Sequence, residues 1–408
     1  MNTENRLKLS LMMFLEFFIW GAWFVTLGTF LANNLGASGT QTAAAFSTQS
    51  FGAIIAPFIV GLIADKYINA EKILGILHLI GALLMYLMFK STSFDGFYPF
   101  ILTYMIVYMP TLAMVNTISF NQMKDPEKEF SKIRVFGTLG WIVAGLAISY
   151  LFHWDSNTGV SSGLLKNTFL MGGIASLVLG FFSFILPSTP PKMKEKGKRS
   201  VSEILGFDAL KLLYNNDFLV FFISSIFICI PLAFYYQNAN VFLSDIGMEN
   251  PTGKMTIGQI SEVFFMLLLP IFFKKFGFKK TLFFGMLAWV LRYVLFAYGN
   301  SGDLTFMLIL GIALHGICYD FFFVSGQIYT DSKADENNKG AAQGLITLAT
   351  YGLGMLIGFW IAGRITDTFT FGNSLQWKQI WLIPAGIAVI VALFFIVLFK
   401  ESHTTHKS

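Results

Sequence analysis

Two acidic side chains lie inside long apolar runs of this sequence, where an ionised group is costly. Asp320 is near the middle of residues 306–329, and Glu262 lies within residues 258–273. An ionised aspartate at the centre of a membrane helix costs about 3 kcal/mol, and such groups usually face a polar cavity and mark an ion or substrate path. The two carboxylates together indicate proton-coupled transport.

A second set of polar residues follows helical spacing. Arg134, Thr138 and Trp141 occur at i, i+4 and i+7, which puts a cationic donor, a hydroxyl and an indole on one helix stripe. Gln259 and Glu262 are three residues apart and share a helix face. Such side chains can stack on a flat ring and bond its polar atoms. In the simpler interpretations, Arg134 anchors a cytoplasmic helix end and Gln259 and Glu262 join two helices by hydrogen bonds.

A histidine and a tyrosine precede Asp320. His315 and Tyr319 are four residues apart on one face of the expected helix, and Asp320 is one residue further round. A histidine near a carboxylate can relay protons, contact a solute or simply pack as a polar residue. Asp320 could instead form a structural ion pair with Arg292, because charges inside membranes tend to pair.

The composition predicts the elements that hold these residues. Of 408 residues, 55% are hydrophobic, 17% aromatic and only 12% charged, with a mean hydropathy of +0.64. These values exclude a soluble globular protein. Windows of about 20 apolar residues, the length that spans a membrane, predict an all-α membrane protein. Its twelve transmembrane helices are expected near residues 9–32, 42–64, 73–90, 98–120, 134–152, 167–187, 217–243, 257–274, 280–299, 304–328, 341–365 and 380–399.

Basic residues predict the orientation of these helices. Lysine and arginine concentrate in alternate connections, whereas residues 32–41 and 298–303 carry neither. By the positive-inside rule, both chain ends are expected in the cytoplasm. The formal net charge of +5 therefore reflects topology, and nucleic acid is not an expected partner. Cys229 and Cys318 both lie within predicted helices, which gives a disulfide no support.

The longest polar stretch, residues 186–217, separates six predicted helices from six. We expect an N-terminal six-helix half at residues 1–187 and a cytoplasmic loop at 188–216, then a C-terminal six-helix half at 217–400 and a cytoplasmic tail at 401–408. The apolar spacing of residues 201–213 suits a short helix at the membrane interface. No connection holds an enzyme domain, and the phosphate-binding pattern Gly-x-x-x-x-Gly-Lys-Ser/Thr is absent from the sequence.

A weak internal repeat supports two similar halves. Residues 61–74, after the second predicted helix, resemble residues 270–282, after the eighth. Parallel six-helix halves are typical of the major facilitator superfamily, whose substrate site lies near the membrane midplane between the halves. Gly61, Asp65 and Lys66 resemble the conformational-switch loop of that superfamily, although the later glycine and arginine of the motif are missing.

The polar segments inside the helices, taken together, resemble those of the nucleoside:proton symporter family of this superfamily. They occur in matching order through nearly the whole chain, at residues 18–31, 61–82, 108–120, 133–142, 258–272, 287–299 and 319–329. The resemblance implies proton-coupled nucleoside uptake by alternating access in the bacterial cytoplasmic (inner) membrane, by a monomer and not an enzyme. The implied partners are a nucleoside, protons and the lipid bilayer, with no cofactor and no metal.

The family pattern also implies residue roles. It favours Arg134 and Thr138 as substrate contacts rather than helix anchors, and Asp320 as the proton-coupling group beside Glu262. A base would stack on Trp141, while the other side chains bond the ring heteroatoms and ribose hydroxyls. The resulting substrate-binding set is Arg134, Thr138, Trp141, Tyr236, Gln237, Gln259, Glu262, His315 and Tyr319.

The seventh predicted helix departs from the family pattern. Ala233 and Tyr236 stand where familiar members have glutamine and asparagine, and Gln237 and Asn240 could replace them from nearby turns. His315 likewise stands where some relatives have tyrosine. These departures leave the choice between purine and pyrimidine open.

Three other functions would use some of the same residue types. A sugar or oligosaccharide proton symporter of the same superfamily would also need aromatic plates, amides and a carboxylate. A multidrug exporter fits less well, because these polar residues suit a hydrophilic solute. A membrane enzyme would need a nucleophile with its base or a metal cluster, and the five histidines lack metal-ligand spacing. For Glu16, Asn116 and Gln327, which also lie in apolar windows, helix packing is the simpler role.

Overall fold

The chain folds almost entirely into helices. The computed structural model describes residues 2–59, 68–125, 129–191, 207–334, 339–372 and 374–400. Within these ranges the strands form a single short antiparallel pair, in which Thr370 is opposite Leu375 and Phe371 opposite Ser374. The all-α architecture expected from the apolar windows is confirmed. The expected switch loop, with Gly61, Asp65 and Lys66, lies outside the described residues.

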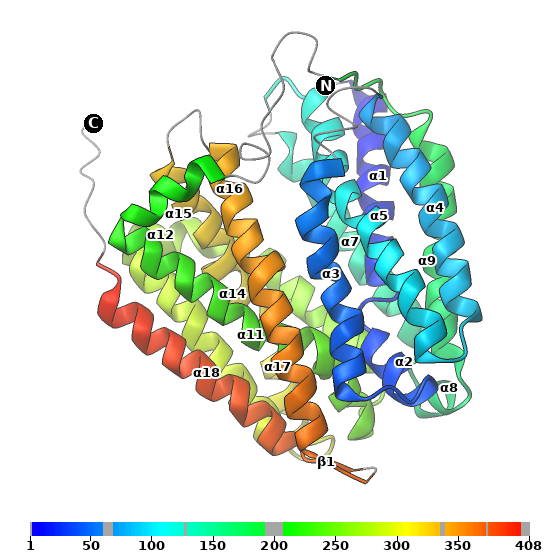
Figure 1. Cartoon of the computed structure of the whole chain (residues 1–408), viewed down its shortest axis with the longest axis vertical. Helices are drawn as coiled ribbons and strands as arrows, with labels where there is room; N and C mark the ends of the chain where they lie inside the picture. Colours follow the sequence, from blue (N-terminus) through cyan, green and yellow to red (C-terminus); the bar gives the residue numbers. More distant parts are fainter. Residues whose placement is uncertain are drawn as a thin grey trace. The chain divides into compact units, whose positions relative to one another are not determined.

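Long helices follow one another along the chain (Figure 1). The first part contains α1 (Thr3–Gly21), α2 (Leu27–Asn34), α3 (Gly39–Ile59), α4 (Ala70–Lys90), α5 (Phe94–Asn121), α7 (Ser131–Leu146), the π-helix η2 (Ala147–Leu151), α8 (Asn157–Ser161), the 3-10 helix η3 (Leu164–Lys166) and α9 (Asn167–Ser183). The second part contains the 3-10 helix η4 (Phe207–Tyr214), α11 (Asn216–Asp245), α12 (Pro251–Tyr298), α13 (Thr305–Ala313), α14 (His315–Tyr319), the π-helix η5 (Asp320–Val324), α15 (Ser325–Lys333), α16 (Lys339–Thr347), the π-helix η6 (Leu348–Gly354), α17 (Met355–Thr368), β1 (Thr370–Phe371), β2 (Ser374–Leu375) and α18 (Trp377–Leu398).

Nine helical stretches in the described part of the chain are long and apolar enough to cross a membrane. One of them, α12, covers both the eighth and the ninth predicted segments. It changes direction at Gly277, whose φ of 71° suits glycine. The first predicted segment is interrupted by a turn at residues 22–26, between α1 and α2. The full count of twelve spans stays a prediction.

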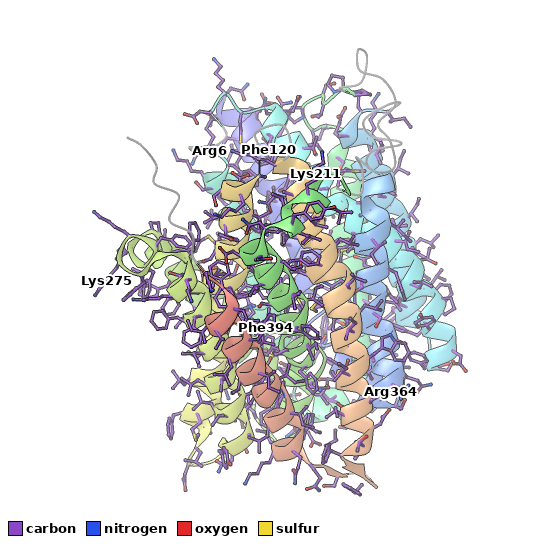
Figure 2. All side chains as sticks on the ribbon, turned by 60° about the vertical axis from the view of Figure 1, so that its left-hand side comes forward. Arg6, Phe120, Lys211, Lys275, Arg364 and Phe394 are labelled. Atoms are coloured by element: carbon purple, nitrogen blue, oxygen red, sulfur yellow. The ribbon has the colours of Figure 1, made fainter. Side chains whose placement is uncertain are left out.

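Apolar side chains cover outward faces of these helices. Phe181 of α9 is 63% exposed and Ile390 of α18 is 68% exposed, and similar residues follow along both helices. Soluble proteins rarely expose apolar surface on this scale, whereas lipid covers it in a membrane. Figure 2 labels Phe394 on α18 and Lys275 beside the bend of α12.

The described elements gather into two compact units. Unit 1 contains Met1–Lys198 with Tyr236–Thr256, and unit 2 contains Arg199–Tyr235 with Ile257–Ser408. Both α11 and α12 therefore begin in one unit and end in the other. The two six-helix halves expected at residues 1–187 and 217–400 are divisions of the sequence, and their boundaries stay a prediction. Of the expected interfacial helix, the described residues form the short 3-10 helix η4.

Close helix contacts organise unit 1. Its α1 packs against α7 and α9, and α4 packs against α5 and α9 (Figure 1). A Cβ atom added to Gly140 of α7 would lie 3.0 Å from backbone atoms of Phe14 and Phe18 in α1. Glycine at a membrane helix crossing lets two backbones approach this closely. The contact fixes the position of α7 against α1.

Two helical stretches of unit 2 contain π turns. The segment η5 lies between α14 and α15, and η6 lies between α16 and α17. A π turn departs from the α-helical bonding pattern and is frequent at functional sites. Tyr319 directly precedes η5 and Tyr351 lies within η6, and their hydroxyl oxygens are 2.8 Å apart. The π turns therefore adjoin a contact between two helices.

We expect Gly140→Ala to destabilise the protein, because the added methyl group meets backbone atoms of α1. Overpacking of this kind costs about 1–3 kcal/mol, so thermal unfolding in detergent should begin several degrees lower. Gly344→Ala is the matched control, because nothing lies within 4 Å of its added Cβ and alanine is favoured in helices by roughly 0.5–1 kcal/mol. Equal shifts for the two variants would contradict the close contact of α1 with α7.

Candidate functional site

The polar stripe expected from the sequence is present on α7. Arg134, Thr138 and Trp141 lie at successive turns of this helix, and each is half-buried. The guanidinium carbon of Arg134 lies 4.1 Å from the ring centroid of Phe17 in α1, a cation–π contact. The indole rings of Trp141 and Trp20 meet edge to face, with centroids 5.6 Å apart. Aromatic residues of α1 therefore support both ends of the stripe.

An aromatic contact connects this stripe with α11 inside unit 1. The ring centroid of Phe24 lies 6.4 Å from that of Trp141 and 5.5 Å from that of Tyr236. The next residue, Gln237, is buried, and its Nε2 donates to the carbonyl of Gly39 at 3.5 Å. The structure therefore brings Tyr236 near the stripe, whereas the amide of Gln237 contacts the start of α3.

Asn240 takes part in an internal network. Its Oδ1 accepts from the hydroxyl of Thr29 at 2.6 Å, and its Nδ2 donates to the hydroxyl of Thr252 at 3.0 Å. All three residues are buried. The sequence offers Asn240 as a replacement for the missing family contacts on this helix, but both ends of its amide are already bonded within unit 1.

Unit 2 contains a chain of three ionisable side chains. Nη1 of Arg292 lies 3.1 Å from Nδ1 of His315, and Nε2 of His315 lies 4.0 Å from Oε2 of Glu262. Arg292 and His315 are buried, while 19% of the Glu262 side chain is exposed. The Tyr235 ring stacks on His315 at 5.3 Å and carries the guanidinium of Arg292 at 3.5 Å from its centroid. Gln259 lies on the same helix, three residues before Glu262, as expected.

The arginine determines how His315 is protonated. A guanidinium only donates hydrogen bonds, so Nδ1 of His315 accepts and the ring proton lies on Nε2, the nitrogen nearer Glu262. A fixed cation, a neutral imidazole and a carboxylate thus follow one another. In such a series a proton can be held at the carboxylate, beside a ring whose N–H faces it.

Asp320 departs from the rule that buried polar groups are bonded. It is the first residue of η5 and is fully buried, and neither carboxyl oxygen has a hydrogen-bond partner among the described residues. The hypothesis of a structural ion pair with Arg292 is wrong, because Arg292 bonds His315 instead. An ionised carboxylate in this position would be costly. A bound proton would remove that charge.

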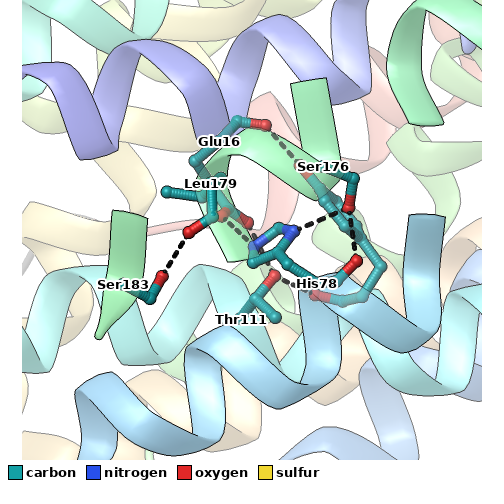
Figure 3. A network of polar contacts seen from close by, with 7 residues as sticks. Glu16, His78, Thr111, Ser176, Leu179 and Ser183 are labelled. Atoms are coloured by element: carbon teal, nitrogen blue, oxygen red, sulfur yellow. Dashed lines mark hydrogen bonds and ion pairs between the residues drawn. The ribbon is translucent and has the colours of Figure 1, made fainter. Parts of the chain in front are cut away.

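In unit 1 the buried carboxyl group of Glu16 differs from Asp320, because both of its oxygens have hydrogen-bond partners. Oε2 of Glu16 lies 2.8 Å from Nε2 of His78, and Oε1 accepts from Thr111 at 2.6 Å (Figure 3). The hydroxyl of Ser176 donates to the carbonyl of His78 at 2.9 Å and lies 3.1 Å from Nδ1 of the same residue. Because Ser176 has one hydroxyl proton, Nδ1 must donate to it. The other ring nitrogen, Nε2, makes its hydrogen bond with Oε2 of Glu16, so both ring nitrogens of His78 are bonded.

This pair connects four helices of unit 1. Glu16 lies on α1, His78 on α4, Thr111 on α5 and Ser176 on α9. The arrangement agrees with the interpretation of Glu16 as a helix-packing residue. Figure 3 shows the network enclosed by these helices.

Spacing along the sequence does not identify every residue of the site. Phe17, Phe24, Tyr235 and Tyr351 meet their partners from other helices. The sequence does indicate Phe17 and Phe24, because residues 17–24, FFIWGAWF, are rich in aromatic side chains. Arg292 is conspicuous as a charge in an apolar window, but its partner is His315 rather than the expected aspartate.

The architecture and the buried ionisable groups define a class of protein, the multi-pass helical transporters. Comparison with known families is more specific: residues 1–404 match the model of the family described as Nucleoside H+ symporter. The chain belongs to this family, whose members are transporters and not enzymes.

Individual relatives extend over the whole chain. Escherichia coli (strain K12) YegT is 43% identical over 403 residues, which cover 97% of this chain and 94% of YegT. The xanthosine permease of that strain is 33% identical, with 98% and 97% covered. The crystal structure of the nucleoside transporter NupG has a TM-score of 0.87 at 30% identity, with 98% of this chain and 100% of NupG covered. The fold class expected from the sequence is thereby confirmed.

We expect Glu16→Ala to destabilise the protein by about 1–3 kcal/mol, because it leaves the buried ring of His78 without its hydrogen-bond partner. Ser183→Ala is the control: this hydroxyl is also buried but bonds only the carbonyl of Leu179 in its own helix, so its loss should cost roughly 0.5–1.5 kcal/mol. Thermal unfolding in detergent measures both effects. The double variant Glu16→Ala/His78→Ala should lose less stability than the sum of its single variants, and strict additivity would argue against a direct contact between the two side chains.

Proposed function

We propose that this chain takes up nucleosides together with protons across the bacterial cytoplasmic membrane. The observation that carries the proposal is Asp320, a buried carboxyl without a hydrogen-bond partner among the described residues, in a member of the nucleoside:proton symporter family. Two relatives are named for their substrates, xanthosine permease and nucleoside permease NupG. Their names support nucleosides as the substrate class.

The proposed substrate contacts match the parts of a nucleoside. We assign the base to Trp141, since stacking on an aromatic side chain contributes about 1–3 kcal/mol, with Arg134 and Thr138 bonding its heteroatoms. Gln259 and Glu262 are assigned to the ribose hydroxyls, each bond contributing roughly 0.5–1.5 kcal/mol net. The remaining candidates are Tyr236, Gln237, His315 and Tyr319. Gln237 has a buried Oε1 without a partner among the described residues, which supports its place in the set.

Charge explains why a nucleoside fits better than a nucleotide. A phosphate group would add negative charge to a site assigned Glu262 and, in its ionised form, Asp320. Arg134 is the one cation in the proposed substrate set that could offset it. We therefore assign neutral nucleosides to this transporter and exclude their phosphates.

The proposed proton-coupling groups are Asp320 and Glu262. A proton on Asp320 removes a charge that the surrounding helices do not satisfy. Release of that proton becomes favourable only when the carboxyl meets water or a cation. A conformational change that hydrates Asp320 would therefore couple proton release to transport. Glu262, whose Oε2 lies 4.0 Å from Nε2 of His315, would serve as the second place where a proton is held.

We further propose that both termini face the cytoplasm and that a single chain is the working unit. Four lysines flank the bend of α12, Lys274, Lys275, Lys279 and Lys280. Basic connections of this kind remain on the cytoplasmic side of a membrane.

Transport by purified protein in proteoliposomes tests the function directly. An inward proton gradient should drive accumulation of labelled uridine or adenosine, and a protonophore should abolish it. Unlabelled nucleosides should compete, while nucleoside monophosphates and hexoses should not. Free bases should compete more weakly, because they lack the ribose hydrogen bonds.

Two outcomes would contradict the proposal. Competition by a disaccharide with none by any nucleoside would favour the sugar symporter instead. Accumulation that follows a sodium gradient at constant pH would exclude proton coupling.

We expect Asp320→Asn to lose accumulation while it keeps exchange of internal for external nucleoside. The amide has nearly the same shape but cannot release a proton, so a proton gradient no longer drives the cycle. Asp303→Asn is the matched control, because Asp303 is exposed in the connection between α12 and α13. Equal loss of accumulation and exchange would assign Asp320 a structural role.

A further inference from the structure

The ends of α11 and α12 are bonded to unit 1, although the rest of each helix belongs to unit 2. The division falls between Tyr235 and Tyr236 in α11 and between Thr256 and Ile257 in α12. Residues 236–256 therefore form a segment whose packing partners differ from those of the helices that continue it. We call this segment the hairpin.

A buried aspartate holds the α12 side of the hairpin. Oδ2 of Asp155 accepts from the backbone N–H of Thr252 at 2.9 Å and from the hydroxyl of Ser149 at 2.5 Å. The hydroxyl oxygen of Ser149 in turn accepts from the N–H of Gly253 at 2.7 Å. The two N–H groups belong to the first turn of α12, where a carboxylate is favoured by the helix dipole. All these side chains are buried.

An amide and two hydroxyls hold the α11 side. Asn240 of the hairpin accepts from Thr29 of α2 and donates to Thr252, so both helices of the hairpin are joined to each other and to α2. We call Thr29, Ser149, Asp155, Asn240 and Thr252 the latch. Its members come from three separate parts of unit 1.

Close backbone approaches accompany the latch. A Cβ atom added to Gly145 of α7 would lie 2.8 Å from Cγ2 of Thr256, and one added to Gly28 of α2 would lie 2.9 Å from Cγ2 of Val241. The hairpin is therefore in direct contact with α2 and α7. The contact of the hairpin with unit 1 therefore combines close packing with the hydrogen bonds of the latch.

The backbone on both sides of the latch is strained. Among the described residues, only His153 and Asn250 adopt a positive φ without being glycine, at 54° and 51°. The first lies two residues before Asp155, and the second directly precedes α12. Conformations of this type cost about 1–3 kcal/mol each and concentrate at functional and switching segments.

The chemistry of the latch suits a contact that opens repeatedly. A buried apolar seal loses its hydrophobic stabilisation when water enters, whereas buried polar groups regain hydrogen bonds to water. Oδ1 of Asp155 is buried without a partner among the described residues, so opening would hydrate it. Closed and open arrangements of such a contact can therefore be close in free energy.

From these observations we propose that the latch is the outer gate of the transporter, with Asp155 as the gating residue. The proposal rests on the proposed uptake function and on cytoplasmic termini, which place the ends of α2 and η2 outside. Figure 1 shows α2 and α8 at the end of unit 1 away from the N-terminus. In the outward-facing state, the hairpin separates from α2 and α7 and exposes the inner surface of unit 1 to the outside medium.

A disulfide across the closed gate tests the proposal. Gly145→Cys with Thr256→Cys puts a sulfur near the present position of Cγ2 of Thr256, 2.8 Å from the new Cβ at residue 145, which is compatible with disulfide geometry. The native Cys229 and Cys318 are both buried and are replaced by alanine in the background. Oxidation should reduce nucleoside uptake and exchange to the level of empty liposomes, and a reductant should restore both.

Comparison of the reduced, oxidised and background proteins tests the gate separately from the proposed nucleoside transport. If the reduced protein accumulates nucleoside and the oxidised, cross-linked protein does so at the same rate, the gate is elsewhere. If the unmodified background protein transports sugars rather than nucleosides, the proposed function fails while the cross-linking result still decides the gate.

A second measurement does not depend on the disulfide. Thr256→Cys is nearly isosteric and buries its thiol beneath the latch, so a membrane-impermeant maleimide added outside cells labels it only when the gate opens. Asp155→Ala leaves the N–H of Thr252 and the hydroxyl of Ser149 without their acceptor in the closed state, and the labelling rate should rise about tenfold. Asp95→Ala is the control, an exposed aspartate in the first turn of α5. An unchanged labelling rate in Asp155→Ala would overturn the proposal.

Discussion

The lack of water inside a membrane is the constraint on which this structure depends. A buried polar group there must find a partner within the protein or cost several kcal/mol. Helices meet this requirement for the backbone. For ionisable side chains, the two units meet it in opposite ways: Glu16 of unit 1 is bonded to His78 and Thr111, while Asp320 of unit 2 has no partner in the part of the chain that the structure describes.

This difference suggests a division of roles. The hydrogen bonds of Glu16 and His78 join four helices, so unit 1 presents the α7 stripe from a firmly bonded framework. The two carboxyl groups that we propose to change their protonation, Asp320 and Glu262, both lie in unit 2. A transporter coupled to protons needs both kinds of arrangement. Its framework must stay bonded while a proton enters and leaves other groups. The latch adds a third case, a buried aspartate whose bonds can be exchanged for water.

Local patterns predicted much of this architecture. Apolar windows locate the helices because membrane length and hydropathy are properties of contiguous residues, and helical periodicity places Arg134, Thr138 and Trp141 on one stripe. The failures concern partners from distant segments. The expected pair of Asp320 with Arg292 does not form because His315, five residues before Asp320, bonds the arginine. The assignment of residues 236–256 to unit 1 depends on tertiary contacts that no periodicity reveals.

The central claim is that nucleoside binding and the protonation of Asp320 are linked. Calorimetric titration with uridine at one pH, in two buffers with different enthalpies of ionisation, measures the protons taken up or released on binding. The account predicts a heat of binding that depends on the buffer in the unaltered protein. In Asp320→Asn, uridine should still bind but this dependence should be reduced or lost. Equal heats in both buffers for the unaltered protein, at every pH at which it binds uridine, would contradict the claim.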